Sequence, residues 1–312
     1  MGRYTVRRLL QIVPLLFGTT FLIFVMIYAL PGDKVTRLTG SEKAPSAARI
    51  AYLKHEYNLD DPLVVQYGKY IGKLATGDFG LTNTQQPVTQ LLKNEYPVSL
   101  KLGLVGIIIE AAIGITIGVA AGLRRNGVVD KTVLIVTLVI AAIPSFVICF
   151  VLQLLIGVEL RQVFHLPVSG ISRGFPVSFL LPGVCVAALG LAVLSRLTRT
   201  TIVENLRSDY VRTAVAKGLP RRRVVGVHTL RNTLIPIVTQ IGSDLSSIMG
   251  TAVVTETIFN LPGIGFQVAQ SVRAGDTPTV VGIVTLLVLI YAVVNLLIDL
   301  LYAVLDPRIR YE

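Results

Sequence analysis

Six stretches of the sequence are apolar and long enough to cross a lipid bilayer as helices. The hydrocarbon core is about 30 Å thick, which requires roughly 20 consecutive helical residues. The composition agrees, because 53% of the 312 residues are hydrophobic and only 15% are charged, against about 25% charged residues in a soluble domain. We therefore predict an all-α membrane protein with six transmembrane helices, at about residues 9–30, 97–122, 132–157, 178–197, 233–257 and 279–305.

The Lys and Arg residues predict the orientation of these helices. Six spans put both termini on one side of the membrane. That side holds 17 Lys and Arg in short segments, whereas the other side holds 11 over many more residues. Positive residues collect on cytoplasmic loops, so both termini should be cytoplasmic. The same rule explains the net charge of +11 without nucleic-acid binding, which we do not expect.

The lengths of the segments between the spans predict three parts. Residues 1–30 form the N-terminal cytoplasmic end and the first helix, 31–96 an external subdomain with helical character, and 97–312 a core domain with the other five helices. In the core, Gly114, Gly118 and Gly122 recur every four residues. This spacing places them on one helix face, where another helix can approach closely.

Motifs of enzymes are missing from the sequence. The stretch GKYIGKL at 68–74 departs from the P-loop pattern in spacing and lacks its final Ser or Thr. The three histidines are dispersed, and no paired carboxylates suggest acid–base chemistry. We therefore expect a chain that is not an enzyme and that binds neither a metal nor another cofactor.

Acidic residues inside or at the ends of the apolar stretches are candidates for function, because charge in a membrane is costly. Glu110 and Asp244 lie inside spans, whereas Glu256 should lie near the external end and be solvated. The most polar stretch of any span surrounds Asp244. Its residues either line a solute pathway or make an internal contact between helices; they are Ser243, Asp244, Ser246, Ser247 and Thr251.

Residues 203–231 form an unusual cytoplasmic loop. An amphipathic helical stretch leads to Gly218, which can adopt the left-handed backbone that ends a helix, and Pro220 is suited to begin the next one. Two short helices joined at an angle would result, with small Ala and Gly side chains that fit a groove on a partner. The alternative is a basic loop resting on anionic lipid headgroups.

At these residues the sequence resembles the EAA loop of ABC importer permeases. The form DYVRTAVAKGL at 209–219 followed by HTLRNTLIP at 228–236 is similar to the oligopeptide/dipeptide branch, with Arg-Thr-Ala in place of Glu-Ala-Ala. Further matches occur in order along nearly the whole chain: LPGD at 30–33, GDFGLT at 77–82, YPVSLKL at 96–102, ETIFNLPGIG at 256–265 and NLLIDLLYAVLDPRIRY at 295–311.

This resemblance implies a type I ABC importer permease fold and a multi-pass protein of the bacterial plasma (inner) membrane. It implies import of di- or oligopeptides, with nickel, haem or another small solute as alternatives. The implied partners are a homologous second permease, two ATP-binding subunits or domains that hold ATP and Mg, an extracytoplasmic solute-binding protein and membrane lipid. The loop would couple to the ATPases through Tyr210, Arg212, Thr213, Ala214, Ala216, Lys217 and Gly218.

Two other classes of protein remain open from the residues alone. A free-standing secondary carrier or channel would use Asp244 or Glu110 as an ion-coupling acid and would need no ATPase. A membrane scaffold would move no solute at all.

Overall fold

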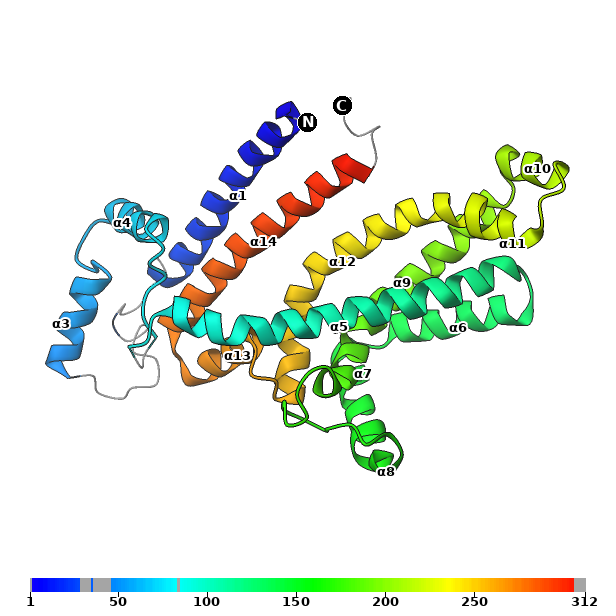
Figure 1. Ribbon diagram of the computed structural model, residues 1–312. Coiled ribbons are helices and arrows are strands. Elements are labelled where there is room, and N and C mark those ends of the chain that lie inside the picture. The colour runs from blue at the N-terminus through cyan, green and yellow to red at the C-terminus, as the bar shows by residue number, and fades with distance from the viewer. Residues whose placement is uncertain (1, 29–34, 36–45, 83–84, 306–312) are drawn as a thin grey trace. The chain divides into compact units, whose positions relative to one another are not determined.

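The structure is a computed structural model that describes residues 2–28, 35, 46–82 and 85–305 (Figure 1). Every regular element in these ranges is a helix, and Leu81 and Pro87 form an isolated β-bridge. The all-α prediction is therefore confirmed. The chain divides into two compact units, unit 1 with residues 1–98 and 262–300, and unit 2 with residues 99–261 and 301–312. The three-part division at residues 30 and 96 stays a prediction.

Unit 1 combines the N-terminal part of the sequence with residues 262–300. It contains α1 (Gly2–Tyr28), α3 (Ala47–Glu56), α4 (Leu63–Ala75), the start of α5 (Val88–Leu123), α13 (Ile264–Ala274) and most of α14 (Thr277–Leu305). In its first hydrophobic cluster Phe24 of α1 packs with Val35 and Leu59. In the second, Val88 and Leu92 of α5 pack with Ile264 and Ile283.

Unit 2 is built around α9 (Val177–Asn205), which packs against α6, α7 and α12. Its other elements follow in chain order. They are the rest of α5, α6 (Val128–Ala142), α7 (Ser145–Leu152), the π-helix η1 (Gln153–Glu159), α8 (Arg161–Phe164), α10 (Asp209–Ala216), α11 (Arg221–Arg223), the π-helix η2 (Val224–Thr229) and α12 (Leu230–Phe259).

Within the described residues, five of the predicted spans each lie in one helix, and 132–157 lies on a bent pair of helices. Among the described residues, three helices are long and apolar enough to cross a membrane: Val88–Leu123, Val177–Asn205 and Thr277–Ile298. The bent pair Val128–Ala142 and Ser145–Glu159 makes a fourth if it is one span, and α1 contributes the shorter apolar stretch Leu10–Val25. The helix α12, which carries Asp244 and Glu256, is not among them.

The prediction of one continuous helix over 132–157 is wrong. The helices α6 and α7 meet at a break of 104°. Ile143 is extended there, with φ −89° and ψ 129°, and Pro144 precedes the first residue of α7. Proline disfavours the helical conformation in the residue before it and has no N–H to donate, so the chain turns at this point.

The predicted glycine face of α5 is confirmed. A Cβ added to Gly118 would lie 2.6 Å from the carbonyl oxygen of Ser195, and one added to Gly122 would lie 2.7 Å from the Ile202 side chain. A Cβ added to Gly114 would lie 3.2 Å from a side-chain carbon of Leu194. The face therefore lies directly against α9, as the four-residue spacing indicated.

Candidate functional site

The elbow, which we define as residues 208–224, begins with helix α10. Asp209 lies in the first turn of α10, where a carboxylate favourably meets the positive end of the helix dipole. The helix ends as predicted at Gly218, whose φ is +76°. Leu219 N–H donates to Ala214 O (3.3 Å) and Gly218 N–H donates to Val215 O (2.9 Å). This pair of bonds is the Schellman motif, and Gly is favoured at its left-handed position.

A small hydrophobic cluster packs the inner side of the elbow. Val211 and Ala214 of α10 are buried against Val224, with Leu219 packed beside them. Ala214 is only 5% exposed. Its small side chain therefore lets α10 pack against the segment that follows it. A partner groove would contact other residues.

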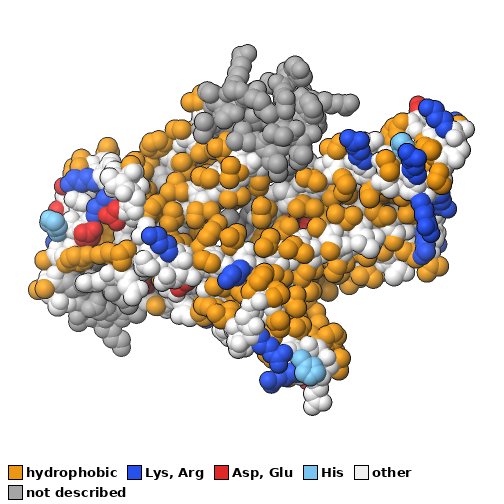
Figure 2. All heavy atoms as spheres, viewed as in Figure 1, with side chains coloured by type: hydrophobic (Ala, Val, Ile, Leu, Met, Phe, Trp, Pro, Cys, Tyr) orange, Lys and Arg blue, Asp and Glu red, His pale blue; other side chains and the backbone are white. Residues whose placement is uncertain are grey.

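The opposite side of the elbow is open. Tyr210, Val215 and the remaining predicted coupling residues are exposed, namely Arg212, Thr213, Ala216, Lys217 and Gly218. Figure 2 shows that Lys and Arg side chains gather over the end of unit 2 that carries α10 and α11. Pro220 precedes α11, as expected from its position in the sequence. The elbow thus offers a basic surface with a few apolar side chains.

Hydrogen bonds tie the elbow to α9 and α12. The Tyr210 hydroxyl donates to Asn205 Oδ1 (2.7 Å), and Asn205 Nδ2 donates to Thr233 Oγ1 (3.1 Å). Thr233 in turn donates to Thr229 O (2.9 Å) and is fully buried. Asn205 is the last residue of α9 and Thr233 lies in the first turn of α12. We did not identify this link from the sequence, because no spacing rule connects the three residues.

A buried ion pair joins α9 to the start of α6. Arg199 Nε and a terminal guanidinium nitrogen each lie 2.8 Å from one oxygen of Asp130. Asp130 also accepts from Asn126 N–H at 2.8 Å and is almost completely buried. Bidentate pairs of this kind fix orientation as well as distance. The ion pair holds the 124–127 turn against α9.

Of the predicted pathway residues, the structure describes two side chains. Ser243 is exposed on α12, whereas Asp244 beside it is half-buried. Both oxygens of Asp244 accept from Gln240 Nε2, at 3.0 and 3.1 Å. The side chains of Ser246, Ser247 and Thr251 lie outside the described residues, although their backbone continues α12. The four-residue spacing of Gln240 and Asp244 is a signal for such a pair, although we did not predict it.

Glu110 of α5 lies next to Asp244 of α12. Its carboxyl group is buried, with 1% of the residue exposed, and it interacts electrostatically with Asp244. The carboxyl carbon would lie 2.5 Å from a Cβ at Gly190 of α9. Three helices of unit 2 therefore meet at an acidic pair that the sequence presented only as separate residues.

The expectation that Glu256 is solvated is wrong. Glu256 is fully buried in the last part of α12.

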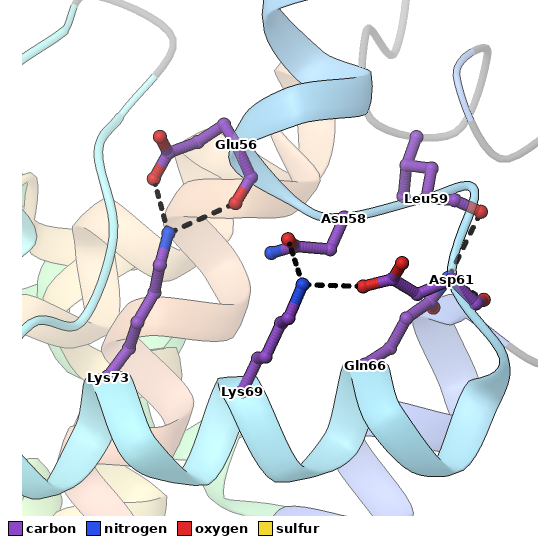
Figure 3. A network of polar contacts seen from close by, with 7 residues as sticks. All are labelled: Glu56, Asn58, Leu59, Asp61, Gln66, Lys69 and Lys73. Carbon is purple, nitrogen blue, oxygen red and sulfur yellow. Dashed lines mark hydrogen bonds and ion pairs between the residues drawn. The ribbon is translucent and has the colours of Figure 1, made fainter.

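The segment of unit 1 between α3 and α4 is held by one face of α4 (Figure 3). Lys73 Nζ donates to Glu56 Oε1 (2.6 Å) and to Glu56 O (3.0 Å). Lys69 Nζ donates to Asn58 Oδ1 (2.8 Å) and Asp61 Oδ2 (2.6 Å). Gln66 on the same face donates to the Leu59 and Asp61 carbonyls. Three side chains of α4 therefore bond to the turn between α3 and α4.

The other face of α4 attaches this segment to apolar helices. The Tyr67 and Phe24 rings lie 5.3 Å apart, and the Tyr70 hydroxyl lies 2.7 Å from Thr285 Oγ1 of α14. Burial raises the pKa of Tyr70 above its usual value, so the phenol stays neutral. The cavity beside these polar contacts measures about 60 Å³, whereas sites for small ligands are typically about 300–1,000 Å³. This cavity is therefore smaller than a typical ligand site.

Comparison with known proteins places these features in a family context. Residues 114–311 match the model of the binding-protein-dependent transport system inner membrane component, and residues 1–103 match the N-terminal model of the same membrane component. The dipeptide transport system permease protein DppB of Escherichia coli K12 is 34% identical over 339 residues, with both chains covered completely.

Two Bacillus subtilis proteins are similarly related. Its dipeptide permease DppB is 34% identical, covering 99% of this chain and 98% of that protein, and its oligopeptide permease AppB is 35% identical with both chains covered completely. Among solved structures, a chain of the MetNI methionine ABC transporter in an inward-facing conformation matches with a TM-score of 0.58 and 16% identity. It covers 70% of this chain and 97% of its own length, and this likeness concerns the fold alone.

Proposed function

This chain belongs to the family of binding-protein-dependent transport system inner membrane components, and we propose that it is one of two permease subunits of an ATP-driven importer of di- and oligopeptides. It is a non-catalytic inner-membrane subunit, and a transport system of this kind implies ATPase subunits and a binding protein as partners. The peptide substrate is supported by full-length relatives named as dipeptide and oligopeptide permeases, at 34–35% identity.

The proposed topology has six spans with both termini cytoplasmic. Helices α1, α5, α9, α12 and α14 and the bent α6–η1 segment supply the spans. The distribution of Lys and Arg, 17 against 11, supports the orientation. A homologous second permease would enclose the pathway together with this chain, and membrane lipid would cover the exposed apolar faces. Ser243, Asp244, Ser246, Ser247 and Thr251 would face that pathway.

The elbow is proposed to couple the chain to two ATP-binding subunits or domains, which hold the ATP and Mg. The observation that carries this proposal is that the hydrophobic cluster, the left-handed Gly218 and the Tyr210–Asn205–Thr233 link make the elbow a fixed attachment on α9 and α12. Closure of the ATPases around ATP would then displace both helices together. Alternating access of the pathway follows if the two helix arrangements bind substrate differently.

The test is reconstitution of the complete transporter in proteoliposomes. We expect uptake of labelled dipeptide that requires both ATP and the binding protein. Val215→Arg, on the exposed side of α10, should abolish uptake and the stimulation of ATPase activity. The control Val64→Arg changes another exposed valine, on the external helix α4, and should leave ATPase stimulation intact. Wild-type stimulation in the Val215 variant would contradict the docking assignment.

A further inference from the structure

One face of α7 and η1 is apolar and exposed along its whole length. Its side chains recur every four residues and are each 50–55% exposed; they are Phe146, Phe150, Leu154 and Val158. Residues four apart lie close to one face of a helix, and we call these four side chains the apolar stripe. Val158 lies twelve residues after Phe146, a rise of at most about 18 Å. The stripe is therefore about as long as one leaflet of a hydrocarbon core about 30 Å thick.

An open cavity lies beside the end of the apolar stripe. Its volume is about 660 Å³, within the range of about 300–1,000 Å³ that is typical of small-ligand sites. A Cβ at Gly157, the neighbour of Val158, would lie 3.4 Å from Val168, which lines the cavity. The polar lining comes from α8 and the loop after it, through Arg161, Gln162, His165, Ser169, Ser172 and Arg173. We call this space the basic cavity.

Hydrogen bonds to other elements hold the loop that forms the basic cavity. Gln153 Nε2 of η1 donates to Val168 O (3.0 Å). Gly170 N–H donates to Phe259 O (2.7 Å), which lies at the end of α12. The loop is therefore attached on two sides, and the cavity is formed by the fold before any ligand binds.

The basic cavity carries positive charge without a compensating carboxylate. Arg161 and Arg173 line it, and none of its lining side chains is acidic. No ion pair of the described part of the chain includes either arginine. Arg173 donates to His165 O, which uses one of its five N–H donors. Figure 2 shows basic and histidine side chains beside hydrophobic ones at the end of unit 2 that carries α8.

We propose that the basic cavity binds the phosphate of an anionic phospholipid, whose acyl chains lie along the apolar stripe. Guanidinium groups match phosphate oxygens through paired N–H donors. The Ser169 and Ser172 hydroxyls supply further donors at the same cavity. In the proposed topology this loop is external, so the lipid belongs to the outer leaflet. The inference uses that topology but does not depend on a peptide substrate.

The combination of charge and apolar surface favours a lipid over other occupants. A free anion would fill the cavity but leave the stripe uncovered. A second permease on the stripe would also have to place an acidic side chain at the cavity. An anionic phospholipid supplies the negative charge and the apolar chains in one molecule, and its chains match the length of the stripe.

The experiment titrates the complete transporter in detergent with lipid and counts bound molecules by native mass spectrometry. The probes are dioleoyl phosphatidylglycerol and dioleoyl phosphatidylcholine, which have the same chains but a net charge of about −1 and about 0. We expect the wild type to bind phosphatidylglycerol at its tightest site at least about 10-fold more tightly. Arg161→Gln should weaken that binding about 10-fold or more, as expected for the loss of a charged hydrogen bond.

Two other variants separate the cavity from general effects of charge. Arg273→Gln is the matched control, because Arg273 is an exposed arginine at the end of α13 and lies on the predicted external side. Its binding of phosphatidylglycerol should equal that of the wild type. Leu154→Asn keeps every charge but interrupts the apolar stripe, and should weaken binding several-fold.

Specific results would overturn the inference. Equal binding of the two lipids by the wild type would do so even if no variant assembled, and so would unchanged binding by Arg161→Gln or an equal loss in the Arg273 control. Displacement of phosphatidylglycerol by inorganic phosphate would assign the cavity to a free anion instead. A wild type that binds no phosphatidylglycerol would leave the second permease as the occupant of the stripe. A transporter that binds the lipid but imports no peptide would refute the proposed function alone.

Discussion

Replacing Gly118 by alanine should separate α5 from α9. The added carbon would lie 2.6 Å from both Ser195 O and Thr198 Cβ, whereas ordinary contact begins at about 3.4 Å. Ser195 O is backbone and cannot rotate away, so one helix must shift. Overpacking of this kind costs about 1–3 kcal/mol, more than the gain of up to about 1 kcal/mol from replacing glycine by alanine in a helix.

The two native cysteines provide the assay. Cys149 and Cys185 are both buried and free in unit 2, and they are the only cysteines of the chain. A thiol-reactive dye therefore reports their exposure during thermal unfolding in detergent. At about 2–4 °C per kcal/mol, Gly118→Ala should lower the Tm by several degrees.

A graded series of glycine variants tests the same contact more strictly. The nearest atom to a Cβ at Gly103 is a side-chain carbon of Ile248 at 3.3 Å, so Gly103→Ala should cost less than Gly118→Ala. The control is Gly72→Ala on α4, where no atom lies within 4 Å, and its Tm should stay the same or rise. If Gly118→Ala melted like the Gly72 control, the close approach of α5 and α9 would be wrong.

Three further predictions concern polar contacts. Asp130→Ala leaves Arg199 without its partner and should destabilise unit 2 by about 1–3 kcal/mol, below the value for a fully buried pair, in the same dye assay. Tyr70→Phe removes the bond to Thr285 and should cost about 0.5–1.5 kcal/mol, measured by urea-induced exposure of the 56–61 turn to protease. Asn205→Ala breaks the elbow link and should reduce ATPase stimulation by substrate several-fold while membrane insertion stays normal. Unchanged stability in either of the first two variants, or unchanged stimulation in the third, would contradict the role given to that contact.

The helices and the elbow could be predicted because their signals are local. Apolar runs locate the helices, and Gly218 followed by Pro220 locates the break in the loop. The bend at residue 144 also has a local signal, which is Pro144. A proline alone, however, does not determine where a helix ends. Pro97 and Pro182 lie inside helices α5 and α9 without ending them, so tertiary packing determines which proline breaks a span.

The candidate sites are less accessible to prediction, because burial depends on which helix face meets another element. The small side chain of Ala214 suggests a surface that fits a partner, yet the elbow buries it against Val211 and Val224. The position of Glu256 near the end of a span suggests exposure to solvent, yet the residue is fully buried. Glu110 and Asp244 come from helices far apart in sequence, and only the fold shows that they share one place.

The position of these features on α12 suggests how a movement of the elbow reaches the middle of the same helix. Thr233, which receives the elbow link, lies eleven residues before Asp244, a rise of about 16 Å along a helix. Pro236 and Gln240 lie between them on the same helix. A displacement of the elbow is therefore transmitted along α12 toward the acidic pair. Since Glu110 belongs to α5, a movement of α12 relative to α5 would change the distance between the Glu110 and Asp244 carboxyl groups.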